Sequence, residues 1–236
     1  MCKVDYLQRL IRGALGAALL LAAGGSARAE DAGPDAIYGV TSLDVAASAS
    51  AQGVALLKQY RDAVRKQAGF VAIELLQEVG APNRFLLFET WKDQAAYDAN
   101  ERSAQTAQLR DTLKPIAGAP PDRRDYHVVS VAAARPAAAN AIFMQLHLDV
   151  FPPGLVPTLA AVKAVAEAAR KGDGNLRYDV VQSVKPPLSH MTLFAAWQDR
   201  KAFDAYEASS YGRKFRDTVG PLLGSPYDDR LYVTVN

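Results

Sequence analysis

The sequence predicts an α+β fold in which two similar units pack sheet to sheet into one barrel. The first observation is a duplication: residues 37–131 reappear, offset by 105 and then 106 positions, as residues 142–236. The second is that both copies have the same order of predicted elements, namely strand, helix, strand, strand, helix and strand. The third is that the strands are apolar on both faces. Helices cover one face of such a sheet, and a tandem copy can cover the other.

The two copies match along their whole length rather than at one motif. The triplet Leu-Asp-Val at 43–45 answers the one at 148–150, and Arg-Asp-Thr at 110–112 answers 216–218. The offset changes by one residue in a turn that holds Pro82 in one copy and Pro186 with Pro187 in the other. Loop tips tolerate insertions because they carry few packing contacts. We therefore interpret the chain as one duplicated supersecondary unit.

Residues 1–29 have the pattern of a secretory leader. Lys3, Arg9 and Arg12 precede an apolar run at 14–23, which is followed by Ala-Arg-Ala at 27–29. The run is shorter than the about 20 apolar residues that cross a bilayer. We expect an exported protein, periplasmic or secreted, with no membrane span. The remaining chain divides into a first repeat at 30–134, a linker at 135–140 and a second repeat at 141–236.

Charge argues against a nucleic-acid partner, and cysteine content argues against disulfide bonds. Without the leader the chain has 23 basic and 24 acidic residues, so its net charge is −1 and no basic stripe predicts a nucleic-acid partner. Cys2 is the single cysteine and lies in the leader. The exported chain therefore has no disulfide, and each repeat of roughly 100 residues must be held by its own core.

The first strand and first helix of each copy follow from apolar periodicity. Strands are predicted at 37–45 and 142–150, where branched and aromatic residues are frequent. One helical face is formed by Val54, Leu57, Arg61 and Val64 in the first copy, and by Leu159, Val162, Ala166 and Ala169 in the second. Gly69 and Gly174 are predicted to end these helices.

The second half of each copy is predicted to contain a hairpin, a helix and a last strand. The hairpins pair 70–79 with 84–91 and 175–184 with 190–197. Val71, Ile73 and Leu75 are expected on one face, with Ala72 and Leu76 on the other. The helices are predicted from N-caps Asp93 and Asp199, with restarts at Ser103 and Ser209 and ends before Pro115 and Pro221. Strands at 125–131 and 228–235 complete two ferredoxin-like units, joined through the Ala- and Pro-rich segment 132–140 into a pseudo-dimeric monomer.

This element order, together with FETWKDQAAYDANERSAQ at 88–105 and FAAWQDRKAFDAYEASSY at 194–211, resembles a known family. The family is the antibiotic biosynthesis monooxygenase (ABM) domain family of the dimeric α+β barrel superfamily, which includes quinol monooxygenases and haem-degrading enzymes. The resemblance covers nearly all of the chain after the leader. It implies oxygenation of an aromatic molecule without a cofactor.

Several positions depart from the family pattern, in which a strand ends in Glu-x-Trp and the next helix carries histidines. Glu89 and Trp91 fit the first element, whereas the second copy keeps Trp197 and has Ala195 in place of the acid. Asn100 and Tyr206 stand at the first histidine position, and Gln105 and Tyr211 at the second. These residues argue against a histidine-based mechanism, including axial ligation of haem.

Glu89 is the main candidate for chemistry. Alternation along a strand places it on one face with Phe85, Leu87 and Trp91, where an acid is unusual. It is either a catalytic base whose pKa is raised by burial, or the partner of an arginine such as Arg61 or Arg110.

The other candidates are aromatic or amide side chains. Trp91 and Trp197 occur in both copies, which favours packing, and they could also wall a pocket together with Phe85. Tyr97, Asn100, Tyr206 and Tyr211 could bind a phenolic or quinone oxygen, or could be ordinary surface residues. We assign Glu89, Trp91 and Asn100 to catalysis, and Tyr97, Phe85, Trp197, Tyr206 and Tyr211 to substrate binding.

Histidines and arginines are given structural roles. His127, His147 and His190 do not have metal-ligand spacing, so no metal site is predicted. Arg110 and Arg216, with Arg124 and Arg230, are expected to form salt bridges between helix and strand rather than anion sites.

Three functions remain open from the sequence. The first is an exported, cofactor-independent monooxygenase acting on a hydroquinone or polyphenol, with a small aromatic or quinone-like molecule as its partner. The second is a non-catalytic module that binds an apolar ligand. The third is haem binding or degradation, for which Tyr206 or Tyr211 could ligate iron. Asymmetry between the copies favours the first repeat as the working site, and further association into a homodimer is left open.

Overall fold

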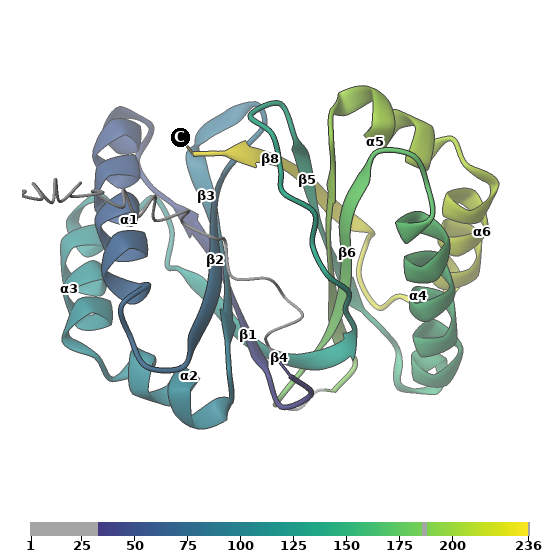
Figure 1. The fold of residues 1–236 in the computed structure, drawn as a ribbon, viewed down its shortest axis with the longest axis horizontal. Helices are drawn as coiled ribbons and strands as arrows, with labels where there is room; N and C mark the ends of the chain where they lie inside the picture. The colour runs from purple at the N-terminus through teal and green to yellow at the C-terminus, as the bar shows by residue number, and fades with distance from the viewer. Residues whose placement is uncertain (1–32, 186–187, 236) are drawn as a thin grey trace, which may run out of the picture.

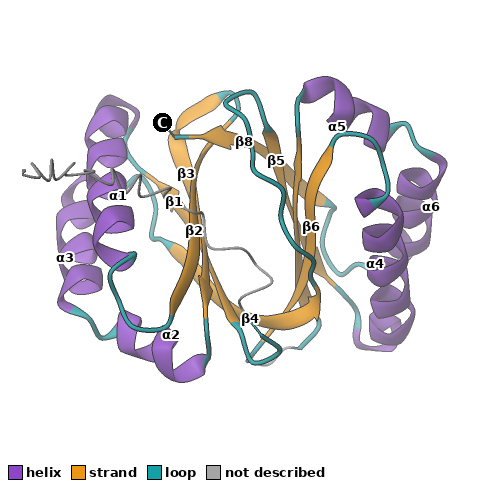
Figure 2. Cartoon of the chain, in the orientation of Figure 1, coloured by secondary structure: helices purple, strands orange, loops and turns teal. Residues whose placement is uncertain are grey.

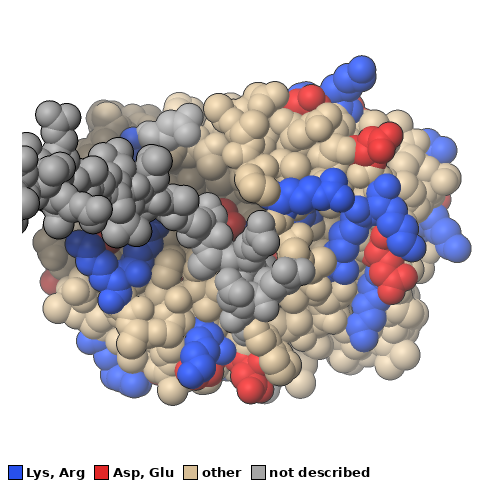
Figure 3. Space-filling model, viewed as in Figure 1, with Lys and Arg blue, Asp and Glu red and all other residues tan. Residues whose placement is uncertain are grey.

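The structure is a computed structural model that describes residues 33–185 and 188–235. The predicted leader and the turn with Pro186 and Pro187 lie outside the described residues. Within the described ranges, no helix has both the length and the apolar character needed to cross a membrane. On the face shown in Figure 3, acidic and basic side chains are interspersed rather than gathered into a stripe of one sign.

Both repeats have the predicted order of elements. In the first they are β1 Ile37–Asp44, α1 Ser50–Val64, β2 Phe70–Glu78, β3 Ala81–Trp91, α2 Gln94–Glu101, α3 Ala104–Leu113 and β4 Asp122–Ser130. In the second they are β5 Ile142–Asp149, α4 Leu155–Arg170, β6 Asn175–Ser183, β7 His190–Trp197, α5 Arg200–Glu207, α6 Ser210–Val219 and β8 Asp228–Thr234. The prediction of two βαββαβ repeats is confirmed.

The eight strands form a closed antiparallel barrel in the order β1-β3-β2-β8-β5-β7-β6-β4. Each repeat contributes four neighbouring strands, and the repeats join through two hydrogen-bonded seams, β2 with β8 and β4 with β6. Neither half therefore keeps an exposed sheet edge. Helices α1–α3 cover one side of the barrel and α4–α6 the opposite side (Figures 1 and 2). The predicted intrachain barrel is confirmed. Its two halves are joined by backbone hydrogen bonds between strands as well as by packing of their sheet faces.

Three apolar cores follow from this architecture. One lies between the sheet and helices of the first repeat, and one between those of the second. The third fills the barrel interior and draws on both repeats, with Tyr38, Phe88, Tyr126, Phe194 and Tyr232 among its members. The bare sheet faces predicted from the sequence thus cover each other.

One buried ion cluster sits in that interior. Arg177 of β6 binds Asp179 at 2.6 Å and also binds Glu74 of β2 in the other repeat. Glu74 and Asp179 occupy equivalent positions in the two copies, whereas the equivalent of Arg177 is Ala72. The Arg177 guanidinium also lies 5.0 and 4.9 Å from the ring centres of Phe88 and Phe194. A single cation therefore serves both halves.

The predicted N-caps, restarts and ends of the second helical segment in each repeat are confirmed. Asp93 and Asp199 accept hydrogen bonds of 2.8 Å from the backbone N–H groups of Ala96 and Ala202, three residues on. Ser103 and Ser209 cap α3 and α6 in the same way. Helices α3 and α6 end before Pro115 and Pro221, because a proline has no N–H group to continue the helical hydrogen bonds.

Three local predictions were wrong. Gly69 and Gly174 do not end helices, because α1 stops at Val64 and α4 at Arg170; the two glycines form the turn before the next strand, with φ of +77° and +75°. Val71 faces the barrel interior, since a bulge between residues 70 and 72 shifts the alternation. Pro82 lies inside β3 rather than in the hairpin turn.

Candidate functional site

Glu89 lies on β3, on the face that packs against the helices of the first repeat, as predicted. Its side chain is fully buried. In the neighbouring strand it is opposite Gly39, where a Cβ atom would come 2.9 Å from the Tyr97 ring and 3.5 Å from the Glu89 carboxylate. The missing side chain at Gly39 therefore leaves space in which Glu89 and Tyr97 lie side by side.

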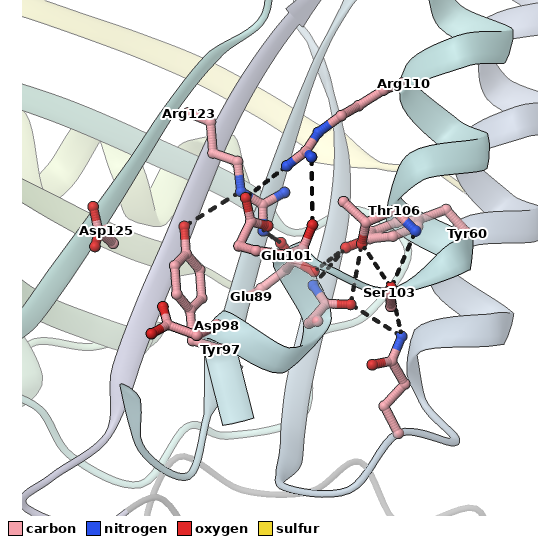
Figure 4. A network of polar contacts seen from close by, with 12 residues as sticks. Tyr60, Glu89, Tyr97, Asp98, Glu101, Ser103, Thr106, Arg110, Arg123 and Asp125 are labelled. Carbon is pink, nitrogen blue, oxygen red and sulfur yellow. Dashed lines mark hydrogen bonds and ion pairs between the residues drawn. The ribbon is translucent and has the colours of Figure 1, made fainter. Parts of the chain in front are cut away.

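Tyr60 and Asn100 form a hydrogen-bonded chain that ends on Glu89 (Figure 4). The Tyr60 hydroxyl donates to Glu89 Oε1 at 2.8 Å, and Asn100 Nδ2 donates to the Tyr60 oxygen at 3.0 Å. Gln67 Nε2 donates at 3.0 Å, and the Thr106 hydroxyl at 3.2 Å, to Asn100 Oδ1. Because the amide oxygen of Asn100 accepts these bonds, its nitrogen is directed toward Tyr60. Asn100 thus acts on Glu89 through Tyr60.

The arginine partner of Glu89 is Arg123 of β4. Its Nη2 atom lies 3.2 Å from Glu89 Oε2, it binds Glu101, and its Nε donates to the Tyr97 hydroxyl at 3.3 Å. The expected type of partner is present, but Arg61 and Arg110 were the wrong residues. Arg61 pairs with its neighbour on α1, and Arg110 bonds Glu101 at 2.7 Å.

The predicted helix-to-strand salt bridges were also wrong. Arg110 and Arg216 join one helix to the next within each repeat, through Glu101 and Glu207. Arg124 and Arg230 pair with an aspartate two positions earlier on their own strands, β4 and β8. Strand alternation explains the difference: Arg123 points toward the helices, and Arg124 into the barrel.

Burial sets the protonation of this network. It raises the pKa of Glu89, while the Arg123 charge and the Tyr60 hydrogen bond act in the opposite direction. Burial also raises the pKa of Tyr97 to about 12 and moves the pKa of Tyr60 further above its usual range. Both phenols are therefore neutral near neutral pH; Tyr60 donates to Glu89, and Tyr97 accepts from Arg123. A buried carboxyl with a raised pKa, held by a hydroxyl and a guanidinium, is suited to accept a proton.

The second repeat lacks this polar set. Ala195, Val165, Phe203 and Asp229 stand where the first repeat has Glu89, Tyr60, Tyr97 and Arg123. Tyr206 instead bonds the hydroxyl of Tyr178 at 2.9 Å. The two repeats therefore offer different chemistry in equivalent places.

The sequence-predicted residues divide between the two sides of the barrel. Glu89, Asn100 and Tyr97 come together in the first repeat. Trp91 is on the same face and packs edge to face on Phe70 at 5.8 Å; Phe85 lies further along β3 in the same core. The remaining three are in the second repeat, where Tyr206 lies 4.8 Å from Trp197 and 6.0 Å from Tyr211 between ring centres.

A small pocket reaches this network from the helix side. It has a volume of about 70 Å³ and lies between α1 and α3, with Tyr60, Gln105 and Leu109 on its wall. Tyr60 thus lines the pocket and also donates its hydroxyl hydrogen bond to Glu89. Gln105 is the residue at the second family histidine position named above.

Sequence reasoning missed Tyr60, Gln67 and Arg123. Tyr60 is three residues after Leu57 and so shares its helical face, which was a usable signal. The position of Arg123 on the helix side depends on the register of β4, and Gln67 lies in a turn. Neither could be placed from periodicity.

The histidines carry no metal cluster in residues 33–185 and 188–235. His147 and His190 lie on paired strands, with ring centres 5.3 Å apart, and His190 Nε2 is 3.1 Å from Asp149. His127 is on β4 and its side chain is exposed. Arg124 Nη1 lies 2.8 Å from His147 Nε2, which favours the neutral ring.

Comparison with known proteins agrees with this architecture. The family profile described as antibiotic biosynthesis monooxygenase (ABM) matches residues 36–112 and 143–218, once in each repeat. No curated protein sequence matches the chain.

Solved structures share the fold at low sequence identity. A candidate monooxygenase from Fusobacterium nucleatum superposes with a TM-score of 0.75 at 12% identity, over 85% of this chain and 93% of that one. A candidate monooxygenase from Lactobacillus acidophilus gives 0.68 at 13%, over 84% and 93%. An anthrone oxidase-like protein gives 0.68 at 11%, over 87% and 93%. At these identities the likeness concerns the fold alone.

Proposed function

Because the chain belongs to the antibiotic biosynthesis monooxygenase family, we propose that it is an exported, cofactor-independent monooxygenase acting on a hydroquinone or polyphenol in its first repeat. The observation that carries the proposal is the buried Glu89 carboxylate, bonded by Tyr60 and Arg123 and replaced by Ala195 in the second repeat. One of the structures that share the fold is named an anthrone oxidase-like protein, and an aromatic substrate for this chain is part of the proposal.

The reaction asks little of the protein. A hydroquinone and O₂ give a hydroxyquinone and water, so one oxygen atom enters the ring and the other is reduced by electrons from the same ring. The substrate becomes a good electron donor once a phenolic proton is removed. The protein therefore needs a base and a site that excludes water.

Tyr60 and Glu89 supply a route for that proton. The Tyr60 oxygen already accepts one hydrogen bond, from Asn100, and a phenolic oxygen has a second lone pair that can accept a substrate hydroxyl. Tyr60 passes its own proton to Glu89 Oε1 as it receives the substrate proton. Arg123 balances the carboxylate between turnovers, and Asn100 positions Tyr60. Trp91 supports the strand that carries Glu89 by packing on Phe70, and Tyr97 holds Arg123 in position by accepting its Nε hydrogen bond.

Substrate access requires a change in the helices. Ligand pockets generally occupy about 300–1,000 Å³, whereas the pocket beside Tyr60 has about 70 Å³. We propose that α3 moves away from α1 to admit the aromatic ring. Glutamine and threonine side chains of this pocket, among them Gln59, Gln108 and Thr112, would then face the substrate hydroxyls.

Oxygen uptake tests the proposal. Menadiol-type and catechol substrates are added under air to the wild type, to Glu89→Gln and to Tyr60→Phe. Loss of general-base assistance should lower kcat by about 10²–10⁴-fold for Glu89→Gln, and Tyr60→Phe should lower it in the same direction. Tyr178→Phe, which removes a buried phenol hydroxyl from the second repeat, is the matched control and should keep wild-type kcat. Equal uptake by the wild type and Glu89→Gln would reject Glu89 as the base.

The second repeat is better suited to a structural or ligand-holding role. Its equivalent space contains the rings of Trp197, Phe203 and Tyr206 and no carboxylate at position 195. The Tyr206 hydroxyl is engaged by Tyr178, which disfavours iron ligation at that atom. A haem titration without a Soret shift would remove the haem alternative.

A further inference from the structure

A second cavity lies inside the barrel, away from Glu89. It has a volume of about 320 Å³ and occupies the end of the barrel where β1 and β5 end and β4 and β8 begin. We call it the barrel-mouth cavity. Its wall is formed by alternate residues of these strands, such as Tyr126 and Tyr232, which face the interior. The residues of the proposed oxygenase site face outward toward the helices, so the two sites are separated by the sheet.

Two arginine–aspartate pairs stand on opposite walls of this cavity. Arg124 donates to Asp122 at 3.0 and 2.8 Å, and Arg230 donates to Asp228 at 3.1 and 3.2 Å. The pairs occupy equivalent positions in the two repeats. Their strands, β4 and β8, are four places apart in the eight-stranded order and therefore face each other across the barrel.

Each pair leaves hydrogen-bonding capacity toward the cavity. A guanidinium has five N–H donors and a carboxylate has about four acceptor positions, and each pair uses two of each internally. Arg124 uses one further N–H on His147. The next residues inward add hydroxyl and amide groups: Tyr232 donates to Gln145 Oε1 at 3.2 Å. Burial raises the pKa of Tyr126 and of Tyr232, so both keep their hydroxyl protons. Both walls therefore carry hydrogen-bond donors and acceptors.

Among the described residues, those that line the cavity carry no excess of positive charge. The residues that line it include three arginines and four carboxylates, the third arginine being Arg84, which pairs with Asp44 and Glu78. His147 adds no charge, because burial and the facing Arg124 lower its pKa to about 4. An anion would meet carboxylates beside each arginine, and a cation would meet arginines beside each carboxylate.

We propose that the barrel-mouth cavity binds a small neutral polyhydroxylated molecule, the size of a monosaccharide or a cyclitol, held between the Arg124–Asp122 and Arg230–Asp228 pairs. A hydroxyl group both donates and accepts, so adjacent hydroxyls match a guanidinium and a carboxylate presented side by side. The Tyr126 and Tyr232 rings offer a surface for the C–H groups of such a ring. The volume lies at the lower end of the range for small-molecule sites, about 300–1,000 Å³.

Calorimetric titration of the full chain tests the ligand class. The probes are myo-inositol, D-glucose and D-xylose as neutral polyols, succinate as an anion and putrescine as a cation, each at millimolar concentration. At least one neutral polyol should bind, and should also raise Tm, while succinate and putrescine bind more weakly. The proposal is overturned if none of the three polyols binds, or if succinate or putrescine binds more tightly than every polyol.

Variants locate the site. Arg124→Met and Arg230→Met should each weaken polyol binding by about tenfold or more, the effect of losing a hydrogen bond from a charged donor. Arg200→Met removes a similar pair, with Asp204, on the outer surface of α5 and should bind like the wild type. Ser42→Leu places a larger side chain in the cavity without altering an ion pair, and should also block polyol binding. It keeps the test decisive if an arginine variant fails to fold. Unchanged binding in Arg230→Met and Ser42→Leu would place the ligand elsewhere. Oxygen uptake by these variants should equal that of the wild type. Failure of the polyol proposal can therefore be distinguished from failure of the oxygenase proposal.

Discussion

Phe88 and Phe194 occupy equivalent positions in the two repeats and stack on each other inside the barrel, with ring centres 3.9 Å apart and planes 10° apart. Their strands, β3 and β7, are four places apart in the strand order, so the rings meet across the interior rather than along the sheet. Each repeat thus contributes half of one contact. This stack joins the halves at a point where neither strand seam reaches.

Truncation of either ring should destabilise the whole barrel. We expect Phe88→Ala and Phe194→Ala each to lower the free energy of unfolding by about 3–5 kcal/mol. The double variant should cost less than the sum, because the ring–ring term of about 0.5–1.5 kcal/mol can be lost only once. Chemical denaturation measures all three. Phe151→Ala, at a side chain that is 55% exposed, should have little effect; strictly additive losses would contradict direct coupling.

Glu74 should make stability depend on pH. Burial raises its pKa above the ordinary 4.5 despite Arg177. A carboxyl whose pKa is higher in the folded than in the unfolded protein contributes stability below the unfolded value, and loses it as pH rises through the folded value. The Tm of Glu74→Gln should therefore improve relative to that of the wild type as pH increases from about 4.5 toward neutral. Asp204→Asn, in the exposed pair with Arg200, is the control; a difference that stays constant with pH would count against this account.

Gly69 and Gly80 form a matched pair for backbone strain. Both have positive φ, +77° and +83°, but a Cβ at Gly69 would lie 2.4 Å from the Cβ of Ala96, and one at Gly80 would meet nothing within 4 Å. Gly80→Ala should cost about 1 kcal/mol from conformation alone, and Gly69→Ala clearly more. Adding Ala96→Gly to Gly69→Ala should recover the difference in thermal melting. An equal loss of stability in the two single variants would show that α2 moves away from the new Cβ atom at position 69 without strain.

Trp197 should matter for stability rather than for turnover. It is buried among Tyr178, Phe203 and Tyr206 in the second repeat, which has Ala195 at the position equivalent to Glu89. Trp197→Phe should lower the free energy of unfolding by on the order of 2 kcal/mol, while kcat for hydroquinone oxidation at a temperature where the variant is folded stays at the wild-type value. A fall in kcat as large as that of Glu89→Gln would assign the second repeat a catalytic part.

Much of the fold could be predicted because its signals are local and occur twice. The branched and aromatic residues of β1, the aspartate caps at Asp93 and Asp199, and the apolar faces of both sheets are each signals carried by a few neighbouring residues. The seams between β2 and β8 and between β4 and β6 could not be predicted, because pairing across the repeats leaves no periodic trace.

The candidate site was predicted only in part. Glu89 stood out as an acid on an apolar strand face, and the order of elements placed Asn100 nearby. Its actual partners depend on register: a shift of one residue exchanges Arg123 and Arg124 between the helix layer and the barrel. On α1, Tyr60 is buried where Arg61 was expected, a difference of one position around the helix.

The covalent link between the halves has a consequence for the interior. In a dimer of identical chains, a residue near the symmetry axis faces its own copy, so position 177 would bring two guanidinium groups, or two alanines, into one space. Here the first repeat has Ala72 at the equivalent position, and the one guanidinium of Arg177 is shared by Glu74 and Asp179. Because both halves belong to one chain, a substitution in one half need not be repeated in the other, and the two halves can differ in sequence at equivalent positions, as Arg177 and Ala72 do.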